Sequence, residues 1–354
     1  MKEAKFDIHG IPAVLYGEES DRLYLFIHGK CGCKEEAGDF AETVSSRGWQ
    51  VLGIDLPEHG SRKGETDAFD PWHLVPELQT VLDYVKTRWS RIALRANSIG
   101  AWFSMLAFRG ETLEKCLFVS PVVDMEQLIR RMMQWAGVTE EELEARGCIQ
   151  TGFGETLSWQ YWQYAKAHPI ESWPCPTAIL YAGQDNLTPR QEITGFAERF
   201  DCALTVMENG EHWFHTPEQL EVLHRWEAAC TAPELPAEEA LFFAGKPEEL
   251  ALYDAFRSRL LSEVEKVRIK VSKTQITFSN KYGFAFVSHP RRKKDGELLI
   301  SFGLSHRQES ERIQYASEPY PGRWTHHLPL RQRTEIDDEL MGWLREAYWF
   351  AAIK

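Results

Sequence analysis

Residues 95–101, Arg-Ala-Asn-Ser-Ile-Gly-Ala, place Ser98 between small residues two positions before and two positions after it. An apolar run over 91–94 precedes this stretch, and residues 101–108 behind it are typical of a helix. The order predicts a strand, a sharp turn and a helix, with Ser98 exposed at the turn. The usual pattern is Gly-x-Ser-x-Gly, and here Ala96 replaces the first glycine. A plain helix N-cap would also explain this serine, so the rest of the chain has to decide its role.

The composition is that of a globular protein, with a formal net charge of −13 over 354 residues. At roughly 100–200 residues per domain, this length predicts two domains. The acidic balance argues against binding to nucleic acid or to an anionic membrane surface. No apolar run has the roughly 20 residues of a membrane span, and residues 1–7 lack a signal-peptide core. The seven scattered cysteines suggest reduced thiols, so we expect a cytoplasmic protein.

Strand and helix patterns alternate through residues 1–230. The continuous apolar run 23–27 suits a strand that is buried on both faces of a parallel sheet. A hairpin over 6–16 comes before it. Further strands are predicted at 49–54, 91–94, 117–121, 177–183 and 203–207, and helices at 34–47, 72–88, 189–200 and 217–230. This alternation predicts an α/β domain with a doubly wound, mostly parallel sheet and helices on both faces.

Residues 125–176 interrupt this alternation, because they contain no good strand pattern. Residues 125–135 form an amphipathic helix pattern, and Thr139 precedes a second helix start. An aromatic cluster follows, made of Trp159, Tyr161, Trp162, Tyr164 and Trp173. An insertion of this length is most simply a helical cap over one edge of the sheet, and a packing layer without substrate contact is the alternative.

The composition changes at residues 231–242, where proline, alanine and glutamate predict a linker. Residues 243–354 then form a different unit. We expect a helix at 247–266, strands at 267–278, 282–287, 297–302 and 312–315, and a last helix at 335–350. Helices that flank antiparallel strands predict a smaller C-terminal α+β domain. The basic stretch 291–296 is interpreted as a solvated turn.

Several polar groups follow directly after the predicted strands of the first domain, where open α/β sheets place their sites. The turn His28-Gly29-Lys30 follows one strand, and Ser98 with Ile99 follows another. Asp185 and His212 each come two residues after a glycine, beyond the last two strands. A hydroxyl, a carboxylate and an imidazole, with backbone N–H groups at Lys30 and Ile99, are the groups that nucleophilic catalysis at a serine requires.

With these motifs together, residues 1–230 resemble an α/β-hydrolase fold serine hydrolase. The matching segments are His28-Gly29, Asp55 to Gly60, Ala96 to Gly100, Gly183 to Asp185 and Gly210 to His212. The resemblance implies Ser98 as nucleophile, His212 as general base and then acid, and Asp185 as the group that orients the imidazole. It implies Lys30 and Ile99 as backbone donors of an oxyanion hole, and neither a metal nor a cofactor.

Two of these assignments have rivals in the sequence. Asp124 follows an earlier strand and could replace Asp185, since some members of the family place the acid there. His215 lies three residues beyond His212 and competes as the base. His28 and His59 are interpreted as structural residues of their loops.

Residues 243–354 resemble a small domain family without an established function. The matching stretches are Phe243 to Pro247, Lys273 to Ser279, Tyr320 to His327 and Glu346 to Tyr348. Lys273, Arg323, His326 and His327 could form a polar pocket for an anion or a polar ligand. Ordinary strand residues are the alternative, because His326 and His327 are adjacent and would point to opposite faces of a strand.

The sequence therefore predicts a two-domain serine hydrolase that cleaves carboxylic esters through an acyl-Ser98 intermediate. Its partner would be a small ester-type substrate, and the partner of the C-terminal domain is unknown. The pattern does not separate an esterase from a thioesterase, an amidase or a carbon–carbon hydrolase. The other hypothesis is a binding or regulatory protein, in which the C-terminal module recognises a ligand or partner and the first domain is a scaffold.

Overall fold

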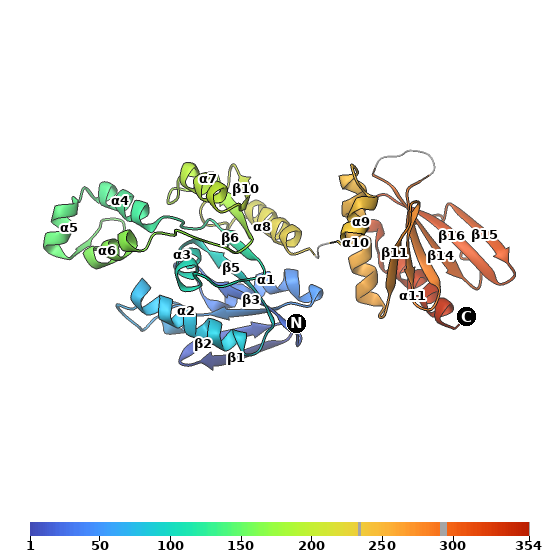
Figure 1. Cartoon of the computed structure of the whole chain (residues 1–354), viewed down its shortest axis with the longest axis horizontal. Helices are drawn as coiled ribbons and strands as arrows, with labels where there is room; N and C mark the ends of the chain where they lie inside the picture. The colour runs from blue at the N-terminus through green and yellow to red at the C-terminus, as the bar shows by residue number, and fades with distance from the viewer. Residues whose placement is uncertain (233–234, 291–295, 354) are drawn as a thin grey trace. The chain divides into compact units, whose positions relative to one another are not determined.

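A computed structural model describes residues 1–232, 235–290 and 296–353. The chain forms two compact units, Met1–Ala232 and Pro233–Lys354 (Figure 1). Each unit has hydrophobic cores of its own. None of the helices in the described part of the chain combines the length and apolarity of a bilayer span.

The first unit contains an eight-stranded sheet in the order β1-β2-β4-β3-β5-β6-β9-β10. All neighbours from β4 to β10 run parallel, and only the β1–β2 and β2–β4 pairs are antiparallel. The strands are β1 (Glu3–Ile8), β2 (Ile11–Tyr16), β3 (Arg22–Ile27), β4 (Gln50–Ile54), β5 (Arg91–Asn97), β6 (Cys116–Val119), β9 (Thr177–Ala182) and β10 (Ala203–Met207). The predicted mostly parallel α/β sheet is confirmed.

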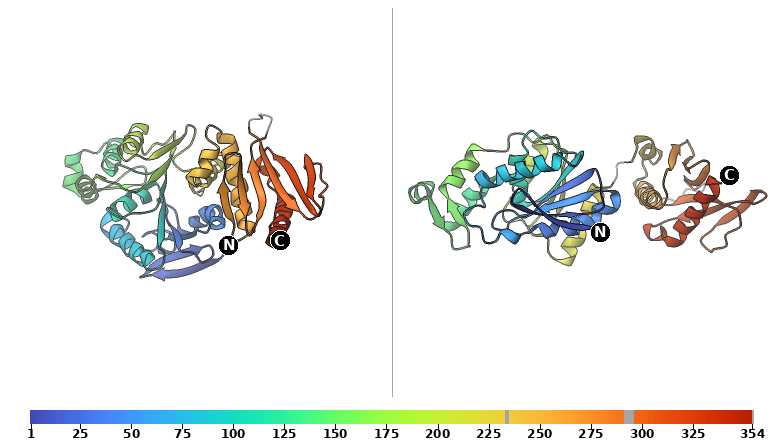
Figure 2. Two further views of the ribbon diagram at one scale, coloured as in Figure 1. Left: turned by 45° about the vertical axis from the view of Figure 1, so that its right-hand side comes forward. Right: turned by 90° about the horizontal axis from the view of Figure 1, so that it is seen from below.

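Helices cover both faces of this sheet, as Figures 1 and 2 show. On one face α1 (Ala37–Val44) and α8 (Pro217–Cys230) pack their apolar side chains against the strands. On the other face lie α2 (Pro71–Lys86), α3 (Ser98–Ala107) and α7 (Arg190–Arg199). Burial on two faces explains why the central strands are apolar throughout and do not alternate.

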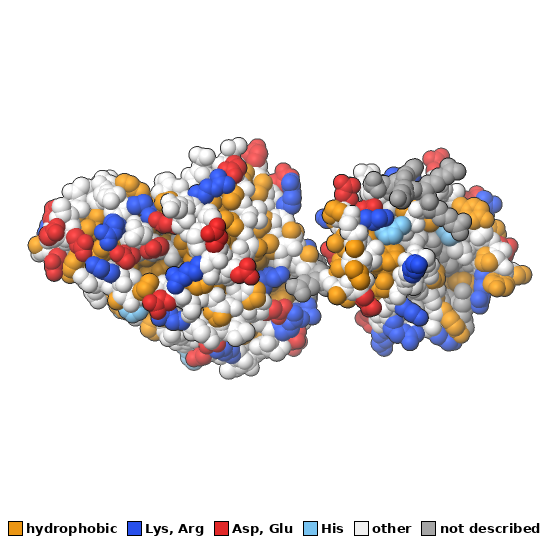
Figure 3. Space-filling model, turned by 45° about the horizontal axis from the view of Figure 1, so that its top comes forward, with side chains coloured by type: hydrophobic (Ala, Val, Ile, Leu, Met, Phe, Trp, Pro, Cys, Tyr) orange, Lys and Arg blue, Asp and Glu red, His pale blue; other side chains and the backbone are white. Residues whose placement is uncertain are grey.

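The insertion after β6 forms a cap of mixed structure. It consists of α4 (Met125–Ala136), α5 (Glu140–Arg146), β7 (Cys148–Gln150), β8 (Thr156–Ser158) and α6 (Trp159–Ala167). The expectation that this segment contains no strand is wrong, because β7 and β8 pair as a small antiparallel ribbon. Three-residue strands are too short to produce a periodic pattern in the sequence. Acidic side chains gather over the cap end of the unit (Figure 3), where α5 begins with three glutamates.

The second unit packs helices on one six-stranded antiparallel sheet, in the order β11-β12-β13-β14-β16-β15. This confirms the predicted α+β class. Its elements are α9 (Ala237–Phe242), α10 (Pro247–Glu263), β11 (Arg268–Val271), β12 (Gln275–Ser279), β13 (Gly283–Ser288), β14 (Leu298–Leu304), β15 (Tyr315–Tyr320), β16 (Arg323–Leu330) and α11 (Asp338–Ala352).

Several details of the second unit differ from the prediction. Part of the predicted linker, residues 237–242, is the helix α9, whose buried Glu239 receives hydrogen bonds from Tyr253 and Arg257. Residues 233 and 234 of that linker, and 291–295 of the basic turn, lie outside the described residues. The single strand predicted at 267–278 is two strands, and the strand predicted at 312–315 begins only at residue 315. The strand β16 contains His326 and His327, as the strand alternative for these residues expects, but its extent was not predicted because its polar residues hide the alternation.

Candidate active site

The turn between β5 and α3 presents Ser98 in a strained backbone conformation. Ser98 has φ of 49°, in the left-handed region that non-glycine residues rarely adopt. A β-carbon at Gly100 would lie 2.3 Å from the carbonyl oxygen of His28, so this position has no room for a larger residue. Ala96 is fully buried between the neighbouring strands β3 and β6. A methyl group therefore fits where the usual pattern has its first glycine, whereas Gly100 is required.

Replacing Gly100 with alanine is expected to displace the His28 turn or the start of α3. Overpacking of this kind typically lowers the free energy of unfolding by about 1–3 kcal/mol. Urea denaturation measures this loss. Ala96→Gly is the matched control on the other side of Ser98, and its loss should be roughly 1 kcal/mol or less, the usual cost of glycine in a strand. Equal losses in the two variants would contradict the crowding at Gly100.

Three side chains from three separate loops form a hydrogen-bonded relay. The hydroxyl of Ser98 lies 2.8 Å from Nε2 of His212, and Nδ1 of His212 lies 2.7 Å from Oδ2 of Asp185. The Asp185 side chain is fully buried. Its Oδ1 accepts hydrogen bonds from the amides of Leu187 and Thr188, at 2.7 and 3.0 Å. A carboxylate held on one oxygen by amides can orient an imidazole with the other.

Glycines hold the two loops behind this relay together. The amide of Gly183 donates to the carbonyl of Met207, and the amide of Gln184 donates to the carbonyl of Gly210. A β-carbon at Gly183 would lie 2.5 Å from the carbonyl oxygen of Glu208. The loops that carry Asp185 and His212 can approach this closely only because Gly183 has no side chain.

Two backbone N–H groups belong to segments that lie next to Ser98. The turn after β3 abuts Ser98, since a β-carbon at Gly29 would lie 3.2 Å from Cβ of Ser98. The amide of Lys30, in this turn, has no hydrogen-bond acceptor among the described residues. The amide of Ile99 belongs to the first turn of α3, where the helix supplies no acceptor. The structure thus places both predicted donors on elements that border Ser98.

The ring of His28 stabilises this turn through two hydrogen bonds to the backbone. Its ring is fully buried, Nδ1 donates to the carbonyl of Gly29 at 2.7 Å, and Nε2 accepts from the amide of Leu56 at 3.1 Å. Burial lowers the pKa of His28 to about 4, so the ring is neutral near pH 7. His59 is buried as well, and Nδ1 of its ring donates to the carbonyl of Pro57. Both histidine rings form hydrogen bonds with backbone groups of loops. This agrees with the structural roles expected for them.

The rivals for the acid and the base lie outside the relay. Asp124 is the N-cap of α4 and accepts a hydrogen bond from the amide of Gln127. The ring of His215 bonds to the carbonyl of Trp213 at 2.6 Å and lies 3.6 Å from the carboxylate of Glu211. Among the described residues, it is Asp185 and His212 that line up with Ser98.

Arg95 anchors the strand β5 through a buried ion pair. Its guanidinium donates to Glu227 of α8 at 2.9 Å and to the side chain of Asn97, next to Ser98. Both charged side chains are almost completely buried. Loss of one partner would leave an uncompensated charge inside the protein.

Replacing Arg95 with alanine is therefore expected to lower the free energy of unfolding by about 3–5 kcal/mol. Urea denaturation is the measurement. The double variant Arg95→Met/Glu227→Met removes both charges and should lose much less. A double variant that is as unstable as Arg95→Ala would contradict the role given to the unpaired charge.

The predicted polar pocket of the second unit is not formed. Lys273 lies between β11 and β12, whereas Arg323 begins β16 near the opposite edge of the sheet. His326 is buried in the core, stacks on Phe302 and accepts a hydrogen bond from the amide of Gln308. His327 points to the other face, where it contacts Ser301 and Tyr315. The structure agrees with the alternative, in which His326 and His327 are ordinary strand residues whose side chains point to opposite faces. Lys273 and Arg323 are apart because the order of strands in a sheet cannot be inferred from their order in the chain.

Contacts between the cap and the body of the first unit were not predicted. The ring of Tyr161 on α6 stacks at 5.9 Å on Trp102, which lies one helical turn beyond Ser98. Lys30 forms an ion pair with Glu155 in the cap. Of the predicted aromatic cluster, Trp162 and Trp173 are buried in the core. In the described part of the chain, no three His, Cys, Asp or Glu side chains are arranged to hold a metal.

Solved structures that are similar to this chain include the following three. Est1E from Butyrivibrio proteoclasticus, with bound ferulic acid, aligns with a TM-score of 0.53 and 20% identity, over 64% of this chain and 96% of Est1E. A putative hydrolase from Agrobacterium vitis aligns at 0.52 and 19%, over 62% and 93%. Alpha/beta hydrolase domain-containing protein 10 from mouse aligns at 0.51 and 17%, over 64% and 96%.

The first unit has the α/β-hydrolase fold. Ser98, Asp185 and His212 thus stand at the carboxyl edge of an α/β-hydrolase sheet, in the order in which the chain first presents them. Residues 239–351 match the family model described as domain of unknown function DUF5655. Among curated proteins, none matches the chain.

Proposed function

We propose that the chain is a serine hydrolase that cleaves carboxylic esters through an acyl-Ser98 intermediate. The observation that carries this proposal is the relay from Ser98 through His212 to Asp185, with distances of 2.8 and 2.7 Å. A serine hydroxyl is a weak nucleophile until a base within hydrogen-bond reach removes its proton. The left-handed backbone of Ser98 supports the same role, since strained residues gather where a side chain must be presented.

In the first half of the reaction, Oγ of Ser98 attacks the ester carbonyl carbon while its proton moves to Nε2 of His212. The carbonyl oxygen becomes an oxyanion, and the amides of Lys30 and Ile99 donate to it. Each such donor is typically worth about 3 kcal/mol in the transition state. Asp185 stabilises the imidazolium through Nδ1. The tetrahedral intermediate then collapses, the alkoxide takes the proton from Nε2 and leaves as the alcohol, and Ser98 remains acylated.

In the second half, a water molecule replaces the alcohol. Nε2 of His212 removes a proton from this water as the oxygen attacks the acyl carbon. The same two amides receive the second oxyanion. When the intermediate collapses, Oγ of Ser98 recovers the proton from His212 and the carboxylic acid is released, so the enzyme returns to its starting state.

The aromatic side chains of the cap favour an apolar or aromatic substrate. The rings of Trp102 and Tyr161 stack one helical turn from Ser98, and Trp72 contacts Tyr161 edge to face at 6.1 Å. Ligand pockets are lined mainly by such side chains, with a few polar groups that set orientation. Est1E, which shares the fold, binds ferulic acid, so aryl-acid esters belong among the first substrates to test.

The test is a labelling and activity screen of the full chain. We expect a fluorophosphonate probe to label the protein, and p-nitrophenyl esters from acetyl to decanoyl, together with methyl ferulate, to be hydrolysed. A thioester and an anilide with the same acyl group as one of the esters then show which class of leaving group is cleaved. The proposal requires the ester to be hydrolysed faster than the anilide. A folded protein that is neither labelled nor active on any ester would instead support the non-catalytic scaffold.

A further inference from the structure

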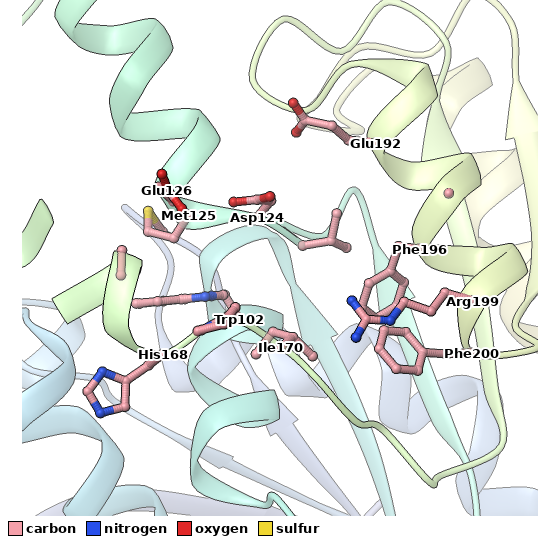
Figure 4. A pocket seen from close by; sticks show the side chains of 14 residues that line it. Trp102, Asp124, Met125, Glu126, His168, Ile170, Glu192, Phe196, Arg199 and Phe200 are labelled. Carbon is pink, nitrogen blue, oxygen red and sulfur yellow. The ribbon is translucent and has the colours of Figure 1, made fainter. Parts of the chain in front are cut away.

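A separate cavity of about 220 Å³ lies at the base of the cap (Figure 4). Its walls come from the start of α4, the segment after α6, helix α7 and Trp102 of α3. The residues that line it include neither Ser98 nor His212, so it is distinct from the candidate active site. A cavity of this size is below the range of drug-sized pockets and suits a smaller ligand.

The floor of the cavity is apolar. Trp102, Val123, Ile170 and Phe196 line it, and each of these side chains is at least nine-tenths buried. In Figure 4 the Trp102 and Ile170 side chains lie below Asp124 and to the left of Phe196 and Phe200. Such a floor would accept an aliphatic or aromatic group.

One carboxylate at the rim lacks a cationic partner. Glu126 forms an ion pair with Arg130, and Glu192 forms one with Arg131. Asp124 is exposed. It is the N-cap of α4, and its side chain accepts a hydrogen bond from the amide of Gln127. Within the described residues, no basic side chain forms an ion pair with Asp124.

One guanidinium faces the cavity from the other wall. Arg199 of α7 donates to the carbonyl of Glu171 at 3.0 Å and lies over the ring of Phe200 at 5.0 Å. No acidic side chain in the described ranges forms an ion pair with it. Figure 4 shows its guanidinium directed into the cavity, across from Asp124. The remaining polar ring in the lining, His168, is bonded to the carbonyl of Tyr164.

We propose that this cavity binds a small zwitterion with an apolar body, such as an amino acid with an aliphatic or aromatic side chain. Asp124 would receive the ammonium group, Arg199 would bind the carboxylate, and the Trp102 floor would cover the apolar part. Hydrogen bonds between ionised partners are roughly twice as strong as neutral ones. A ligand with only one of the two charges would leave one rim residue without a partner.

The first test is a calorimetric titration of the full chain with two sets of ligands. One set is L-phenylalanine, 2-phenylethylamine and 3-phenylpropionate, and the other is 6-aminohexanoate, hexylamine and hexanoate. We expect at least one zwitterion to bind at least about ten-fold more tightly than both of its singly charged analogues. Ser98→Ala should bind it equally well, because the cavity does not include Ser98. Absence of binding up to roughly 10 mM, or no preference for a zwitterion, overturns the proposal.

Two variants then test the assigned residues with the zwitterion that binds. Asp124→Asn removes the charge but keeps a good helix cap, so α4 should persist. Arg199→Gln removes the guanidinium. Each should weaken binding at least about ten-fold, while Arg190→Gln, on the same helix and paired with Glu208, should leave it unchanged. If Asp124→Asn and Arg199→Gln bind like the wild type, the site lies elsewhere and the proposal is wrong.

Discussion

Replacing Ser98 with alanine is expected to lower kcat for ester hydrolysis by about 10⁶-fold, the loss found when a relay serine is removed. Without Oγ no acyl-enzyme can form, and only slow attack by water near the oxyanion donors remains. The same variant should lose all labelling by the fluorophosphonate probe. Hydrolysis of p-nitrophenyl acetate and in-gel fluorescence are the two measurements.

Ser104→Ala is the matched control for this result. Ser104 lies on the same helix, and its hydroxyl donates to the carbonyl of Gly100 at 2.7 Å, away from the relay. Its variant should still be labelled. A Ser98→Ala protein that is folded by circular dichroism and is still labelled would remove Ser98 from the mechanism, whatever its rate of hydrolysis.

Replacing Asp185 with asparagine should lower kcat by roughly 10⁴-fold, the loss found when a relay aspartate becomes asparagine. The side-chain oxygen of asparagine can still accept from the amides of Leu187 and Thr188, so the loop should keep its shape. Its NH₂ group would then face Nδ1 of His212. That contact favours the tautomer with the proton on Nε2, which cannot accept the proton of Ser98.

A comparison of variants at His212 and His215 tests which histidine is the base. His215→Asn, at the rival histidine, should change kcat less than about two-fold, because this ring lies outside the relay. His212→Asn should be about as inactive as Ser98→Ala, since the two groups act as a unit. If His215→Asn were the inactive variant, the relay seen in the structure would not be the one that operates.

The positions of Ser98, Asp185 and His212 could be predicted because each follows an apolar strand. Parallel strands end at one edge of the sheet, so residues far apart in the chain are brought to the same place by a pattern that is visible locally. The α/β class followed from the same alternation. The ribbon β7–β8 and the extent of the strand β16 were not predicted, because very short or polar strands have no clear period.

The sequence by itself determined the local features of this protein: the strand, turn and helix around Ser98, the glycines beside Asp185 and His212, and the division into an α/β and an α+β unit. These depend on neighbouring residues, whose backbone preferences act over a few positions. Only the tertiary structure decided that Asp185 and not Asp124 meets His212, and that Lys273 and Arg323 stay apart. Only the tertiary structure brings Asp124 and Arg199 to the lining of the same cavity. Contacts of this kind depend on how distant elements pack, and no short stretch of sequence encodes that packing.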